Sequence, residues 1–187
     1  MHPDWSPADN PHAVALSEAN AWKRAIDLCA NQMRAGSPDD QTDARLFLLA
    51  LRLLLRAQRM ASDAMKALPI AAQIAEDARQ QFDQACPGAK DACDMIEHFA
   101  EYAVGTGDRQ PGGGLRRADR PADRVAAAQD WPLRYDQPTG RILLGPIEMD
   151  VVVVCLHAKL LVHAIWAAVR AFEDAAPSPD SLPMQAE

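Results

Sequence analysis

The segment 89–103 contains three side chains that can bind or transfer protons, spaced about one helical turn apart. Asp94, His98 and Tyr102 are four residues apart, so a helix through this segment places all three on one polar face. An aspartate one turn before a histidine can orient the imidazole and raise its pKa. A histidine held in this way can act as a general acid or base. The same residues also suit an ordinary solvated helix face, so both interpretations stay open.

The run from Cys93 to His98 (Cys-Asp-Met-Ile-Glu-His) resembles the motif of HEPN domains. That motif is an Arg, then usually Asn, Asp or His, then a few residues and a final His. Asp94 and His98 match its second and last positions. The resemblance implies a small α-helical bundle, often dimeric, and for many members a metal-independent RNase of toxin–antitoxin or phage-defence systems. It covers about Cys93 to Tyr102, together with a loose five-helix organisation.

The motif departs from the family at its first position, where Cys93 stands in place of the Arg. In an RNase the guanidinium would stabilise the charge that develops on the scissile phosphate. A cysteine cannot do this, because it is neutral as a thiol and repels phosphate as a thiolate. The resemblance therefore fits a non-catalytic relative at least as well as an enzyme.

Arginines elsewhere in the chain could supply the missing positive charge. A helix from about Thr42 to Leu68 presents a narrow arginine stripe beside a wide apolar side. A second basic segment lies at 109–124. The candidate phosphate or partner contacts are Arg45, Arg52, Arg56 and Arg59 on the stripe, and Arg116 and Arg117 in the later segment. The alternative for the stripe is a solvated face that pairs with acidic neighbours.

Metal and cofactor motifs are missing from the sequence. The four cysteines form no C-x-x-C pair. His157 and His163 are six residues apart, which places them on different faces of a helix. The glycine-rich stretches at 105–107 and 112–114 follow no predicted strand and precede no G-K-[ST]. We therefore predict no metal site and no cofactor.

Composition favours an intracellular globular protein. The chain has 187 residues, of which 49% are hydrophobic, and a net charge of -7, which excludes a whole-molecule basic field for nucleic acid. Four cysteines without a pairing pattern and no signal peptide predict a cytoplasmic location. The apolar stretch from Val151 to Val169 carries Lys159 near its middle, which is costly inside a bilayer, so we predict a buried core helix without a membrane.

Periodicity and breaker residues predict the elements that position these side chains. Apolar spacing and Pro, Gly and Asp signals give five helices, and alternation around Asp136–Gly140 gives one β-hairpin. The helices are predicted at about 11–34, 42–68, 70–85, 89–103 and 148–174, with the hairpin at 131–145. Residues 1–9 are predicted as a flexible arm, 105–130 as a flexible loop and 175–187 as a disordered tail.

The sequence thus predicts an all-α fold, a single helical domain over residues 10–174 with a small β-hairpin inserted before the last helix. Two classes of function remain. The first is a non-catalytic interaction module, HEPN-like, that pairs with itself as a homodimer or with another protein through a helix face. The second is a HEPN-type RNase that acts through His98, with Asp94 as the orienting residue and an arginine from elsewhere on the phosphate.

Overall fold

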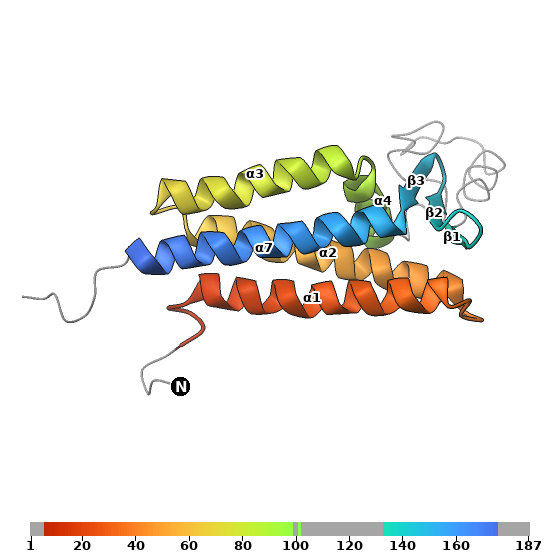
Figure 1. The fold of residues 1–187 in the computed structure, drawn as a ribbon, viewed down its shortest axis with the longest axis horizontal. Coiled ribbons are helices and arrows are strands. Elements are labelled where there is room, and N and C mark those ends of the chain that lie inside the picture. The colour runs from red at the N-terminus through yellow and green to blue at the C-terminus, as the bar shows by residue number, and fades with distance from the viewer. Residues whose placement is uncertain (1–5, 99–100, 102–132, 176–187) are drawn as a thin grey trace, which may run out of the picture.

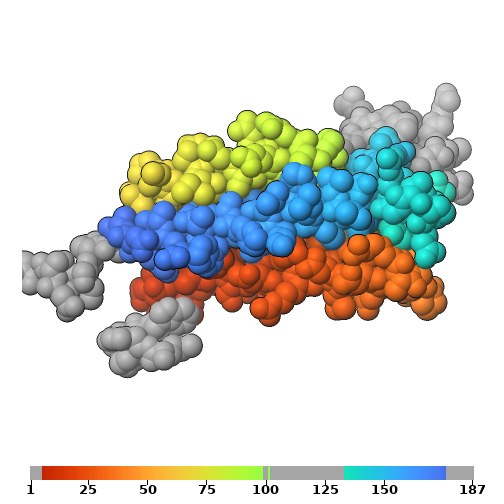
Figure 2. All heavy atoms as spheres, in the orientation of Figure 1, coloured from red at the N-terminus to blue at the C-terminus, as the bar shows by residue number. Residues whose placement is uncertain are grey.

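Four long helices make an up-down-up-down bundle (Figure 1). The computed structural model describes residues 6–98, 101 and 133–175. Within them, the long helices alternate in direction along the bundle, with α7 lying between α1 and α3 (Figures 1 and 2). Their bounds are α1 Pro11–Arg34, α2 Asp40–Ala64, α3 Pro69–Ala85 and α7 Val151–Ala175. A fifth, short helix, α4 (Ala89–Glu97), lies at the end of the bundle where α3 ends.

Helix starts follow from local chemistry. Proline occupies the first position of α1 and of α3, where its missing N–H removes no helical hydrogen bond. Asp39 caps α2, because its carboxylate accepts a hydrogen bond from the Thr42 N–H at 3.3 Å. Asp150 caps α7 by accepting from the N–H groups of Val152 and Val153, at 2.8 and 3.1 Å.

A three-stranded antiparallel sheet precedes α7. Its strands are β1 (Leu133–Asp136), β2 (Arg141–Leu144) and β3 (Ile147–Asp150), in the order β1-β2-β3. In its register Tyr135 pairs with Ile142, and Ile142 pairs with Met149. These three side chains are buried and seal the end of the bundle. The β-hairpin predicted before the last helix is confirmed.

The third strand was not predicted. We expected residues from Glu148 onward to belong to the last helix, but Ile147 to Asp150 pair with β2, and α7 begins at Val151. The turn at Gly145, which has a φ of 56°, reverses the chain directly after β2. Four residues are too few for the period-2 pattern to stand out beside a helix of 25 residues.

The core lies between α2 and the three other long helices. Phe47, Leu51 and Leu54 of α2 are fully buried, as is Ile165 of α7. Burial of each such side chain contributes roughly 1.5–3 kcal/mol. A buried amide also ties α2 to α3, because Gln58 Nε2 donates to the Ala75 carbonyl at 3.0 Å. The helical bundle is the fold class that the sequence predicted, with a three-stranded sheet where a β-hairpin was expected.

Several predicted segments lie outside the described residues. They are the loop 105–130, the tail from 176 and the first five residues of the arm. Tyr102, Arg116 and Arg117 belong to the same undescribed part of the chain. Of the helix predicted at 89–103, the structure describes α4 to Glu97 and a break at His98, whose backbone has φ -99° and ψ 30°. Glu101 is again helical, and the other residues of 99–103 lie outside the described part of the chain.

Candidate functional site

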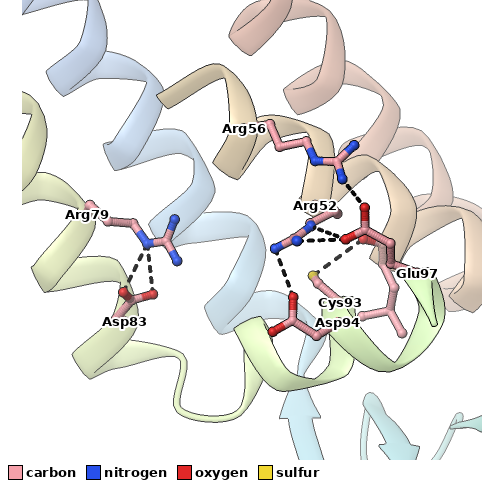
Figure 3. A network of polar contacts seen from close by, with 8 residues as sticks. Arg52, Arg56, Arg79, Asp83, Cys93, Asp94 and Glu97 are labelled. Carbon is pink, nitrogen blue, oxygen red and sulfur yellow. Dashed lines mark hydrogen bonds and ion pairs between the residues drawn. The ribbon is translucent and has the colours of Figure 1, made fainter. Parts of the chain in front are cut away.

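The segment that carries the motif packs against the arginine stripe of α2. Arg52 lies between two acidic side chains of α4 (Figure 3). Its Nη1 contacts Asp94 Oδ1 at 2.9 Å, and its Nη2 contacts Glu97 Oε2 at 2.6 Å. Arg56 makes a further ion pair with the other oxygen of Glu97. We refer to these four residues, Arg52, Arg56, Asp94 and Glu97, as the α2–α4 ion cluster.

The cluster is partly buried and balanced in charge. The side chains of Arg52, Asp94 and Glu97 are 25%, 30% and 31% exposed, whereas Arg56 is 56% exposed. Two guanidinium groups face two carboxylates, so the formal charges cancel. Charge-assisted hydrogen bonds of this kind hold a short helix against its neighbour. They leave no surplus positive charge for a phosphate.

Cys93 lies beneath the cluster at the motif position that an Arg would occupy. Its side chain is 1% exposed, and Sγ donates to the Leu48 carbonyl of α2 at 3.5 Å. Burial raises the pKa of this thiol to about 12, although the positive charge of Arg52 partly opposes the increase. The thiol is therefore protonated at neutral pH and packs as a small apolar group.

The side chain of His98 is exposed and turned toward a different acid from the one predicted. Its imidazole is 57% exposed, and Nδ1 lies 3.8 Å from Glu101 Oε1. The backbone N–H of His98 donates to the Asp94 carbonyl, as expected one turn along a helix. The carboxylate of Asp94 instead binds Arg52. Among the described residues, no contact joins the Asp94 carboxylate to the His98 imidazole.

The remaining stripe arginines are separated from the motif. Arg45 is exposed near the start of α2. Arg59 is 84% exposed and has a distant partner in Asp63, at 3.9 Å. The stripe thus divides into Arg52 and Arg56, which bind α4, and Arg45 and Arg59, which face solvent. Only the first pair could act together with the motif.

Among the described residues, no group of three or more His, Cys, Asp or Glu side chains is arranged to hold a metal ion. The described cysteines are all free thiols.

A pocket of about 450 Å³ opens between the end of α3, the sheet and the start of α7. It is lined in part by Cys86, Arg141, Glu148 and Asp150. Arg141 and Glu148 pair with each other at 2.9 Å, and Asp150 caps α7.

A second feature, which sequence reasoning missed, is the outer side of α7. We predicted a buried core helix, and one side of α7 is buried against α1 and α3. The other side runs across the face of the molecule seen in Figure 2 and exposes five large apolar side chains. We call this surface the α7 face: Val152, Val153, Leu156, Leu160 and Trp166, which are 55%, 37%, 54%, 50% and 50% exposed.

The polar residues on the same side of α7 are few and basic. Lys159, His163 and Arg170 are exposed. Arg170 places its guanidinium 4.9 Å from the centre of the Trp166 ring, in cation–π geometry. The sequence signal was present, because α7 has more apolar positions than a single buried face requires.

Comparisons with protein-family models, with curated proteins and with solved structures find no match. The site is therefore interpreted from its geometry alone.

Proposed function

We propose that this protein is a non-catalytic, cytoplasmic interaction module that forms a homodimer through the α7 face. The observation that carries the proposal is the concentration of exposed apolar side chains on one helix. Among the described residues, five of the ten exposed large apolar side chains belong to α7. A concentration of exposed apolar side chains of this kind is uncommon on monomers and marks interaction sites.

The α2–α4 ion cluster supports a structural role for the motif segment. Arg52 and Arg56 are bound by Asp94 and Glu97, so an RNA phosphate would have to displace carboxylates that are already in place. The net charge of -7 further opposes the approach of nucleic acid. On this proposal, the protein is a relative of HEPN domains in which the motif segment no longer serves catalysis and instead holds α4 against α2.

A lipid surface fits the α7 face less well than a protein does. Helix α7 is long and apolar enough to cross a bilayer by length and composition, and 39% of its most apolar window is buried inside the molecule. Leaving the bundle would expose Val154, Leu161 and Ile165, which are buried in the core. Lys159 and His163 also interrupt the apolar side. A water-excluding contact with another folded surface buries the α7 face without opening the core.

Sedimentation velocity over a range of protein concentrations tests the proposal. The wild type is expected to sediment as a dimer, and Leu156→Glu combined with Leu160→Glu as a monomer. The matched control is Leu46→Glu combined with Leu49→Glu on α2, where the two leucines are 48% and 46% exposed. This control introduces the same charges at the same exposure and should leave the dimer intact.

Two results would count against the proposal. One is a wild type that stays monomeric at every concentration, whether or not this monomer binds anionic vesicles through α7. The other is a dimer that the α2 control abolishes and the α7 variant does not. Far-UV circular dichroism of each variant separates loss of association from loss of folding.

One observation favours the second candidate, a HEPN-type RNase acting through His98. Helix α2 brings the Arg52 guanidinium to 2.9 Å from Asp94, which is next to the position of the missing motif Arg. The exposed imidazole of His98 could then reach a substrate. The test is RNA cleavage by pure protein and by His98→Ala. Cleavage that is undetectable, or equal in the two proteins, rejects this candidate.

A further inference from the structure

The exposed apolar residues of α7 form one surface along the helix. Leu156 lies near its middle, Val153 and Leu160 lie toward one edge and Trp166 lies at the other, and Lys159 and His163 lie within the same arc. At about 100° per residue these side chains span an arc of roughly 140°, and from Val152 to Trp166 the surface is about 21 Å long. A surface of this shape suits a second helix packed along it.

Positions on the α7 face are self-complementary about Leu160. Val153 is seven residues before Leu160, and Ala167 is seven residues after it. An antiparallel pair of α7 helices with its twofold axis at Leu160 therefore places Val153 of one copy against Ala167 of the other. The same operation brings Trp166 to within about one turn of Val152 of the second copy, on the same edge. Leu160 thus meets Leu160 of the second copy at the axis, and away from the axis Val153 and Trp166 each meet a smaller side chain, which allows close packing.

The helix dipoles favour this direction over a parallel one, because they run in opposite directions in an antiparallel pair. Asp150 precedes the helix, and the C-terminal part of the helix carries Arg170 followed by Glu173 and Asp174. Asp150 and Arg170 are each ten residues from Leu160, so the antiparallel pair brings Arg170 of one copy level with Asp150 of the other. A parallel pair would instead place Arg170 of one copy beside Arg170 of the other.

The area of the α7 face is appropriate for the core of a dimer interface. Five large side chains that are about half exposed present on the order of 400 Å² of apolar surface per copy. A stable interface buries roughly 800 Å² per partner, a little over half of it apolar. The α7 face can therefore supply the apolar centre, and the neighbouring surfaces of α1 and α3 the polar rim. A second copy provides a matching face with no additional partner.

We infer that the dimer is an antiparallel α7–α7 pair whose twofold axis passes at Leu160. This inference rests on the proposed function and adds the direction and register of the contact. Packed helices have axes 8–10 Å apart, and Cα atoms lie about 2.3 Å from each axis. The two Leu160 Cα atoms would then be roughly 5 Å apart, within the range that a disulfide bridges.

Mild oxidation of single-cysteine additions tests the register. Leu160→Cys should give a disulfide-linked dimer on a non-reducing gel. Val152→Cys is the matched control, since in the antiparallel pair its two copies are about 24 Å apart along the helix axes and cannot link. Val153→Cys and Ala167→Cys should each fail alone and link when the two proteins are mixed. Wild type, whose Cys155 is half-buried, sets the background.

The outcomes separate this inference from the proposed function. A dimer by sedimentation in which Val152→Cys links as well as Leu160→Cys would overturn the antiparallel register and leave self-association standing. A dimer in which neither variant links would also overturn it. A wild type that never dimerises would remove the proposed function, and the register with it. Linking of Leu160→Cys and of the mixed pair, without linking of Val152→Cys, supports the inference.

Discussion

Replacing Arg52 by methionine should destabilise the fold far more than the same change at Arg59. Methionine keeps the apolar stem and the helix propensity of arginine while it removes the charge. Arg52 contacts Asp94 and Glu97 at 2.9 and 2.6 Å with a side chain that is only 25% exposed. Its loss leaves two partly buried carboxylates without their main partner, which we expect to cost about 1–2 kcal/mol.

Arg59 is the matched control, because it is on the same helix and belongs to the same predicted stripe. Its side chain is 84% exposed and lies 3.9 Å from Asp63, so Arg59→Met should cost less than about 0.5 kcal/mol. Urea unfolding followed by circular dichroism gives both free energies of unfolding. Equal losses in the two variants would refute the structural role assigned to the α2–α4 ion cluster.

Three further predictions concern buried positions. Cys93→Arg, which would complete the HEPN motif, should lower the free energy of unfolding by about 3 kcal/mol or more, because the site is 1% exposed; an unchanged melting temperature would contradict this. The Cys93 thiol should make the wild type lose stability, relative to Cys93→Ala, between pH 9 and pH 12. The pKa of this thiol rises from 9.0 to about 12 on folding, so the unfolded chain loses the proton first as the pH rises. If the free energies of unfolding of the two proteins differ by the same amount at pH 8 and at pH 10.5, the burial effect is contradicted. Gly88→Ala should cost about 2 kcal/mol or more in urea unfolding, because φ is 83° and the new methyl would lie 2.9 Å from Ile147 Cγ2. Gly36→Ala should cost less, since its nearest atom, at 3.1 Å, belongs to the flexible side chain of Gln137; equal costs would show that the contact with Ile147 is unimportant.

Most of the fold could be predicted because its signals are local. Proline at 11 and 69 and the cap at Asp39 fix helix starts within the chain segment itself. The alternation around Asp136 likewise identifies β1 and β2. The strand β3 depends instead on a tertiary contact, since it exists only by pairing with β2.

The site could be predicted only as a set of candidate side chains. Sequence spacing placed Asp94 one turn before His98, but it could not reveal that Arg52, 42 residues earlier in the chain, would bind Asp94 first. The partner of a surface carboxylate is decided by helix packing, which spacing within one helix does not describe. For the same reason, the exposed side of α7 became visible only once its neighbours were in place.

Native mass spectrometry of untagged protein purified from its own host tests the central claim most directly. The account predicts a species with the mass of two chains of 20.4 kDa and no bound RNA. It also predicts that Leu156→Glu combined with Leu160→Glu shifts this species to the mass of one chain. A wild type recovered as a bare monomer, or as a stoichiometric complex with RNA, would contradict a homodimer built on the α7 face.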